Sequence, residues 1–219
     1  MSVARIHMQL IGQPQTHTDS KGEWCTAIYR TAVTGPVVLG LRGLEGDRVA
    51  DTKHHGSKDQ AVCVHPLAHF QHWSGVYGIT LAPGAVGENW TLAGSDADET
   101  LVYIGDIYAI GSARVQVSQP RFPCSKQERK LGIKGFLKAV MATGKSGWYL
   151  RVLTPGATQA GDLLALESRP EQAMTVDDAN RGLLGKEINV ALIERLLEIP
   201  ELSAVWKRGL RRRLGSAQE

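Results

Sequence analysis

The clearest strand signals of this chain lie in residues 103–126, YIGDIYAIGSARVQVSQPRFPCSK. It begins with two runs rich in apolar, aromatic and β-branched residues, 103–110 and 113–118, which flank Gly111-Ser112. A two-residue turn that starts with glycine is typical of a tight antiparallel hairpin. The stretch therefore predicts two adjacent strands that lead into the motif ending at Cys124.

Short strands separated by glycine-rich turns continue on both sides of this hairpin. They are predicted at residues 3–11, 24–33, 37–41, 60–64, 88–92, 147–153 and 162–167. Short helices are predicted from Pro66 onward and at 134–142, whereas 12–23 reads as a polar loop. Many short strands with such punctuation are typical of a barrel. We expect a mainly β fold, a closed or nearly closed β-barrel with short helices, rather than a layered α/β sheet.

The character of the sequence changes after Arg169-Pro170. Thr175-Val176-Asp177-Asp178 resembles a capping box, although aspartate replaces the usual glutamate or glutamine. Residues 188–197 carry an apolar stripe at helical spacing, and a third helix is predicted at about 201–214. We therefore predict a barrel domain at 1–169 and a small three-helix domain at 170–219.

Composition places the chain among globular proteins. It has 219 residues, of which 42% are hydrophobic and 21% charged, and a net charge of +3. This excess lies in residues 201–219, because the preceding residues are neutral overall, which argues against a nucleic-acid surface on the main body. Three cysteines without a paired framework, and no signal peptide or membrane-spanning stretch, predict a soluble cytoplasmic protein.

Cys124 is the cysteine in the most reactive setting. Pro123 precedes it, Arg121 lies three residues before it and Lys126 two residues after it. Nearby positive charge favours the thiolate, the form that attacks electrophiles or binds metals. An ordinary structural cysteine in a turn is the alternative. Cys25 and Cys63 lie inside apolar strands, so we expect both to be buried and inert.

A second polar cluster spans residues 47–59. Lys53, Lys58 and Arg48 surround Gly56, where a missing side chain lets backbone N–H groups approach an anion. A solvated basic turn is the alternative. The adjacent His54 and His55 lack the spacing that places two histidines on one face, which argues against a zinc site.

A third candidate is Gly87-Glu88-Asn89, because an asparagine offers donors and acceptors to a heterocycle. A simple turn is again the alternative. The histidines at 65, 69 and 72 accompany Phe70 and Trp73, which indicates a packing role. A catalytic triad of Cys124 with His55 and Asn89 is the weaker interpretation, since no protease signature surrounds the thiol.

Five motifs, in this order, resemble those of the MOSC family, named after the C-terminal domain of molybdenum cofactor sulfurase. They are Gly46-Asp47, His55-Gly56-Ser57-Lys58-Asp59-Gln60-Ala61-Val62, Gly87-Glu88-Asn89, Gly105-Asp106 and Pro120-Arg121-Phe122-Pro123-Cys124. The resemblance is closest to the YiiM-like bacterial branch, in which three short helices follow a MOSC-type β-barrel. One departure is Ser57, which stands where the family usually has a second glycine.

The resemblance implies that Cys124 ligates the molybdenum of a pyranopterin cofactor, and a soft thiolate suits such a metal. It implies that Arg121, Lys53, His55 and Lys126 bind the cofactor phosphate, with Gly56, Ser57 and Asp59 in the same motif. Asn89 is implied to contact the pterin or the substrate. Catalysis is accordingly assigned to Cys124, His55 and Asn89.

The implied reaction is the reduction of small N-hydroxylated compounds, such as N-hydroxylated purine bases, to amines. The sequence has no recognisable flavin or iron–sulfur motif, so we expect a separate flavin or iron–sulfur reductase to supply electrons, and we also expect a homodimer. Two rivals stay open: a sulfur carrier with a persulfide on Cys124, and a non-catalytic binding module that docks through the basic residues 207–213.

Overall fold

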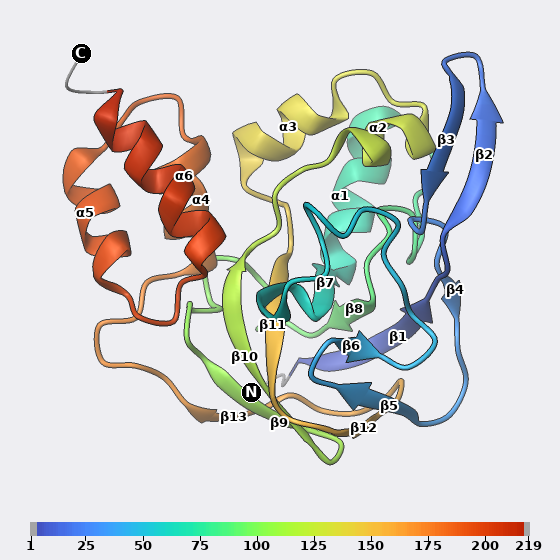
Figure 1. The fold of residues 1–219 in the computed structure, drawn as a ribbon, viewed down its shortest axis with the longest axis horizontal. Coiled ribbons are helices and arrows are strands. Elements are labelled where there is room, and N and C mark those ends of the chain that lie inside the picture. The colour runs from blue at the N-terminus through green and yellow to red at the C-terminus, as the bar shows by residue number, and fades with distance from the viewer. Residues whose placement is uncertain (1–3, 217–219) are drawn as a thin grey trace.

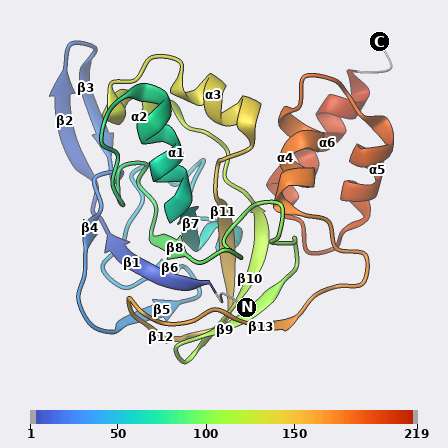
Figure 2. The ribbon, with the colours of Figure 1, turned by 180° about the vertical axis from the view of Figure 1, so that it is seen from behind.

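The computed structural model describes residues 4–216 as a strongly curled β-sheet with short helices over one end and three more helices at one side (Figure 1 and Figure 2). The strands are β1 (Arg5–Ile11), β2 (Gln15–Asp19), β3 (Gly22–Thr26), β4 (Thr31–Ala32), β5 (Val37–Gly40), β6 (Gly43–Leu44), β7 (Val62–Pro66), β8 (Trp90–Ala93), β9 (Ile107–Ile110), β10 (Ala113–Pro120), β11 (Trp148–Thr154), β12 (Gly156–Thr158) and β13 (Ala165–Ser168). The helices are the 3-10 turn η1 (Lys58–Gln60), α1 (Leu67–Tyr77), α2 (Ser125–Leu131), α3 (Phe136–Thr143), α4 (Val176–Leu184), α5 (Val190–Glu198) and α6 (Ala204–Gly215).

Eight strands form the main sheet in the order β13-β9-β10-β11-β7-β8-β1-β4. All neighbours are antiparallel except β7 and β8, which are parallel because α1 crosses between them. The segment before β13 returns to the start of β1: Ile6 N donates to Asp162 O, and Leu164 N donates to Ala4 O. The sheet therefore curls back on itself, and the predicted mainly β, barrel-type fold is confirmed.

The hairpin predicted around Gly111-Ser112 is confirmed. Ala113 pairs with Ile110, so only Gly111 and Ser112 connect β9 to β10. Gly111 has φ of +53°, and a Cβ there would lie 2.2 Å from the carbonyl oxygen of Ala157, so only glycine fits. The predicted start of the first hairpin strand at residue 103 is wrong, because β9 begins at Ile107. Residues 103–106 form a turn instead, because the buried Asp106 carboxylate accepts from Tyr103 N at 3.0 Å.

Two further expectations differ from the structure. The strand predicted at 24–33 ends at Thr26, whose hydroxyl accepts a hydrogen bond from Ile28 N and turns the chain. The predicted polar loop 12–23 contains most of the β2–β3 hairpin. The structure also has a helix that the sequence analysis did not predict, α2, which follows directly after Cys124. The β2–β3 hairpin and α2 both lack apolar periodicity, so tertiary contacts stabilise them. Residue 3, the predicted start of the first strand, lies outside the described residues.

The C-terminal helices share the core of the sheet. The capping box is confirmed, because the Thr175 hydroxyl accepts from Asp178 N at 2.9 Å. Trp206 and Leu210 of α6 belong to the same buried cluster as Val117 of β10, and Ser203 N donates to Ser118 O. The three-helix extension is thus present and packs directly on β10 (Figure 1), while the boundary at residues 169 and 170 stays a prediction.

We expect Trp206→Ala to lower the free energy of unfolding by about 3–5 kcal/mol, the usual cost of deleting a buried large aromatic ring. The sheet and the helices should still unfold in one transition, because they share one core. Urea unfolding followed by circular dichroism and by fluorescence checks both points. Val205→Ala, on the exposed face of the same helix, is the control and should change stability little.

Candidate functional site

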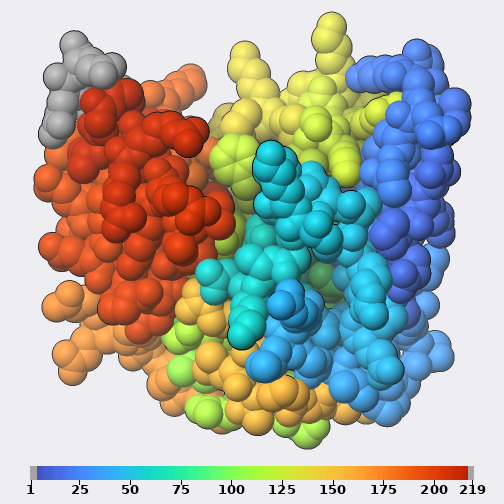
Figure 3. Space-filling view, in the orientation of Figure 1, coloured from blue at the N-terminus to red at the C-terminus, as the bar shows by residue number. Residues whose placement is uncertain are grey.

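A cavity of about 450 Å³ opens at one end of the curled sheet. Its wall combines parts of several segments: most of residues 26–30, most of the loop at 47–56, residues of the strands β7 and β11, and residues of the segment that follows β10. The space-filling view shows the surface hollowed beside that loop (Figure 3). The structure brings six of the predicted site residues to this wall: Cys124, His55, Asn89, Arg121, Gly56 and Lys126.

Three predicted site residues do not lie on the cavity wall. Lys53 and Ser57 are exposed, and the Ser57 hydroxyl contacts Gln60 within the same turn at 3.2 Å. Asp59 forms an ion pair with Arg151 at 2.8 Å. The geometry gives Asp59 a structural role, since it fastens η1 to β11, and the assignment of these three residues to a cofactor stays a prediction.

Arg121 is a buried cation at the base of the cavity. It is 6% exposed, and its Nη2 donates to Val86 O at 2.6 Å. Its Nη1 is also buried and has no hydrogen-bond partner within residues 4–216. An unpartnered buried donor is costly, and a guanidinium is well shaped to bind phosphate or carboxylate. Arg121 therefore provides a donor suited to an anion.

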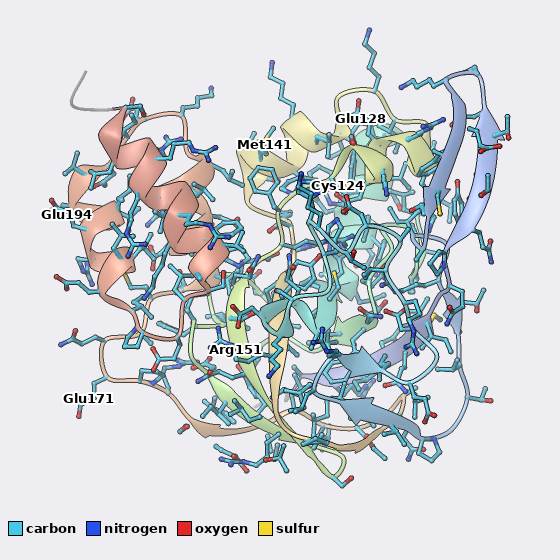
Figure 4. All side chains as sticks on the ribbon, in the orientation of Figure 1. Cys124, Glu128, Met141, Arg151, Glu171 and Glu194 are labelled. Atoms are coloured by element: carbon cyan, nitrogen blue, oxygen red, sulfur yellow. The ribbon has the colours of Figure 1, made fainter. Side chains whose placement is uncertain are left out.

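Cys124 lies at the start of α2, beside the cavity and above β10 and β11 (Figure 4). Its thiol is partly exposed, and its backbone N–H donates to the side chain of Gln127 at 3.1 Å. The Lys126 ammonium donates to the carbonyl oxygen of Cys25 and ties α2 to the β2–β3 hairpin. The thiol is thus held at the mouth of a cationic cavity by contacts on both sides.

Asn89 is on the wall but has structural partners. Its Oδ1 accepts from Cys63 N at 3.1 Å, and its Nδ2 donates to Leu10 O at 3.3 Å. The side chain therefore links β7 to β1. The preceding Gly87 has φ of +71°, and a Cβ there would lie 2.3 Å from a side-chain carbon of Ile28, so this turn requires glycine.

The loop at 47–56 provides the opposite wall. Burial, followed by the positive charge of Arg121, lowers the pKa of His55 below its ordinary value. The ring is therefore neutral near pH 7 and keeps one donor and one acceptor nitrogen. Gly56 has φ of +85° and lets the backbone turn beside Val49. The predicted glycine turn is thus present, and its neighbour His55 offers hydrogen bonds rather than charge.

The structure also brings in residues that the sequence did not single out. Arg30 binds the Asp47 carboxylate with two hydrogen bonds of 2.8 and 2.9 Å and donates to Gly87 O at 2.7 Å. Tyr149 of β11 lies on the wall beside Cys63, and burial raises the pKa of its phenol, which stays protonated. Of the residues in these contacts, only Asp47 belongs to a motif recognised in the sequence, Gly46-Asp47, and no motif indicated Arg30 or Tyr149.

The two other cysteines differ from each other. Cys63 is buried as expected, and burial raises the pKa of its thiol. The expectation that Cys25 is buried is wrong, because alternate side chains of β3 point outward and Cys25 is one of them. Within the described part of the chain, no three His, Cys, Asp or Glu side chains converge as a metal site.

Comparison with known proteins shows the family of this chain. Residues 51–165 match the model of the MOSC domain, and residues 174–217 match the YiiM-like 3-alpha helix domain. The chain belongs to the MOSC family. Protein YiiM of Escherichia coli is 35% identical over 92% of this chain and 89% of its own length. The crystal structure of YiiM from Geobacillus stearothermophilus has a TM-score of 0.79 and 36% identity over 96% of this chain and 99% of its own.

A more distant relative of this MOSC protein is a protein of Gibberella moniliformis named "Reductase". It is 31% identical over 82% of the chain, which covers 32% of that longer protein. Among the described residues of this MOSC protein, no helix is both long and apolar enough to cross a membrane.

We predict that iodoacetamide alkylates Cys25 and Cys124 but not Cys63 in the native MOSC protein. Alkylation needs an accessible thiolate, and Cys63 is buried with a raised pKa. Peptide mass mapping after a short reaction measures all three sites. In urea, Cys63 should react at a rate similar to the other two. Fast labelling of Cys63 without denaturant would contradict the burial of this thiol in the cavity wall.

A second prediction concerns the clamp that joins the β2–β3 hairpin to α2. The Arg129 guanidinium binds both Asp19 carboxylate oxygens, at 2.6 and 2.7 Å, and lowers the pKa of that carboxyl to about 2. This clamp favours the folded state above the ordinary carboxyl pKa of 3.8 and is lost as the pH falls through about 2. The carboxyl carbon shift of Asp19 should therefore stay constant between about pH 6 and pH 3. In Arg129→Gln it should titrate near 3.8, and an unchanged titration would exclude the clamp.

Proposed function

We propose that this protein is a molybdenum-cofactor-dependent reductase that converts N-hydroxylated compounds, such as N-hydroxylated purine bases, to amines. One observation carries the proposal: the partly exposed Cys124 thiol shares a cavity with the buried Arg121, whose Nη1 has no partner within residues 4–216. A single soft ligand beside an anion-binding donor fits a metal that arrives with a phosphate-bearing organic ligand.

The residues present fit such a cofactor. Cys124 would supply the one protein ligand to molybdenum, and Arg121 and Lys126 would bind its phosphate. The turn at His55 and Gly56 would add hydrogen-bond donors on the opposite wall. Asn89 would orient the wall through its bonds to Cys63 and Leu10, which leave one donor and one acceptor of its amide for the substrate. When bound, the cofactor supplies a two-electron redox centre.

The reaction breaks the N–O bond of the substrate and consumes two electrons and two protons to give an amine and water. The protein would contribute a partly enclosed cavity, hydrogen bonds and a fixed thiol, which is the usual division of work with a cofactor. Tyr149 stays protonated beside this cavity and can donate a hydrogen bond to a polar substrate group.

The electron source belongs to the proposal as well. We propose a separate flavin or iron–sulfur reductase as donor. The much longer fungal relative named "Reductase" supports this, because a protein of that length has room for further domains around a MOSC-like segment. A cytoplasmic location, a homodimer and a small N-hydroxylated substrate complete the proposal.

We expect Cys124→Ala and Cys124→Ser to lose molybdenum and at least about a hundredfold in kcat/KM while remaining folded, because the substitution removes the one protein ligand to the metal. The proteins should be purified from a host that makes the cofactor. Metal content, circular dichroism and reduction of an N-hydroxylated base with reduced methyl viologen are the measurements. Cys25→Ser is the matched control, since Cys25 lies outside the cavity wall.

Full molybdenum content and turnover in Cys124→Ala would show that Cys124 is not the metal ligand. Intact mass after incubation with a cysteine desulfurase tests the sulfur-carrier alternative, which predicts an added sulfur atom that disappears in the same variant. Charge reversal at Arg211 and Arg212 tests the docking alternative, which predicts a weaker, salt-sensitive partner complex.

A further inference from the structure

An exposed aromatic ring lies at the mouth of the cavity. Phe122 is 53% exposed and lines the same cavity as Cys124. A single exposed apolar side chain needs no explanation by itself. Phe122 differs from other exposed apolar residues, such as Val205 and Leu166, because it faces the cavity and lies two residues before the proposed metal ligand.

The backbone on both sides of Phe122 is fixed. Arg121 N donates to Gly147 O at 2.9 Å, and its side chain donates to Val86 O. Pro123, which follows, is buried, and its ring restricts φ. The ring of Phe122 is therefore carried by a rigid segment.

The three-helix extension contacts the ring of Phe122. The rings of Phe122 and Trp206 meet edge-on, with centroids 6.2 Å apart and an interplanar angle of 66°. Trp206 is itself fully buried, and its indole N–H donates to Ala179 O at 3.2 Å. In Figure 3 the segment between β10 and α2 reaches the surface between α6 and the loop that follows β6. Phe122 thus contacts α6, while 53% of the residue stays exposed.

The cavity wall is polar and largely cationic. Arg42, Arg48 and Lys126 line the same cavity. A flat, apolar surface within a charged wall is suited to a ligand that is planar and carries polar edges. Base–aromatic stacking is a strong interaction of this kind and does not depend on which base is stacked.

We propose that Phe122, positioned by Trp206 of the helical extension, is the stacking platform that selects planar heteroaromatic N-hydroxylated substrates over aliphatic ones. The kinetic side of this inference rests on the proposed function, whereas the binding side does not. It also gives the extension a role at the site, since Trp206 acts through Phe122 as a positioning residue.

The first test is binding of adenine, a planar base, to the full-length protein purified from a cofactor-producing host. Isothermal titration calorimetry should show that Phe122→Leu weakens adenine about 5- to 150-fold, the range expected for loss of one stacking contact. Phe122→Tyr should bind nearly as well as the wild-type protein, because it keeps the ring. Leu166→Ala, an exposed apolar change outside the cavity, should leave the affinity unchanged.

The second test compares kcat/KM for an N-hydroxylated purine base with that for N-methylhydroxylamine, using reduced methyl viologen as electron donor. The ratio of the two values should fall at least about fivefold in Phe122→Leu, with molybdenum content unchanged. Trp206→Phe should lower the ratio and the adenine affinity by a smaller factor, with the melting temperature recorded to confirm folding.

Each outcome decides a point. Unchanged adenine affinity in Phe122→Leu, or no binding of adenine to the wild-type protein, overturns the stacking platform. Adenine binding that depends on Phe122, without reduction of either substrate by the wild type, overturns the proposed reaction and leaves the platform standing. An unchanged base affinity in a folded Trp206→Phe removes the positioning role alone.

Discussion

The arrangement of this molecule depends on the burial of one guanidinium. Arg121 follows β10, has 6% of its surface exposed and leaves Nη1 without a partner among residues 4–216. A buried, incompletely bonded cation costs free energy, so the surrounding fold has to hold it in place. The ladder of β10 and β11, extended by Arg121 N to Gly147 O, and the carbonyl of Val86 do so. The same contacts fix Phe122 and Cys124, because these residues follow within three positions.

A second constraint is the single core shared by the curled sheet and the three-helix extension. Val117 of β10 and Trp206 of α6 are buried in one cluster, and Ser203 N donates to Ser118 O. The helices therefore stabilise the strand that ends at the site. They also place an indole against Phe122, which lies on the cavity wall. Removal of the extension would expose core surface and leave the Phe122 ring without its contact to Trp206.

Some charged side chains around the cavity are neutralised by an ion pair, whereas others are free to bind a ligand. Arg30 is matched by Asp47, and Asp59 is matched by Arg151 outside the wall. His55 has a lowered pKa and Tyr149 a raised one, so both are neutral near pH 7. Arg121 is the buried cation whose Nη1 lacks a hydrogen-bond partner in the described chain. Because Arg42, Arg48 and Lys126 also line the cavity, this distribution favours an anionic ligand near Cys124, in agreement with the proposed cofactor.

Four features could be predicted from the sequence: the hairpin at Gly111-Ser112, the mainly β fold, the three-helix extension and the motif that ends at Cys124. These features depend on local signals: turn glycines, strand-forming runs, a capping box and a short motif. The tertiary structure alone decided which motif residues share the cavity, since it excludes Lys53, Ser57 and Asp59 from the wall and adds Arg30 and Tyr149. It also decided that Cys25 is exposed and that α2 exists. These properties arise from contacts between segments far apart in the chain, such as Arg129 with Asp19 and Phe122 with Trp206. Such contacts produce no local sequence pattern, so they could not be predicted from the sequence.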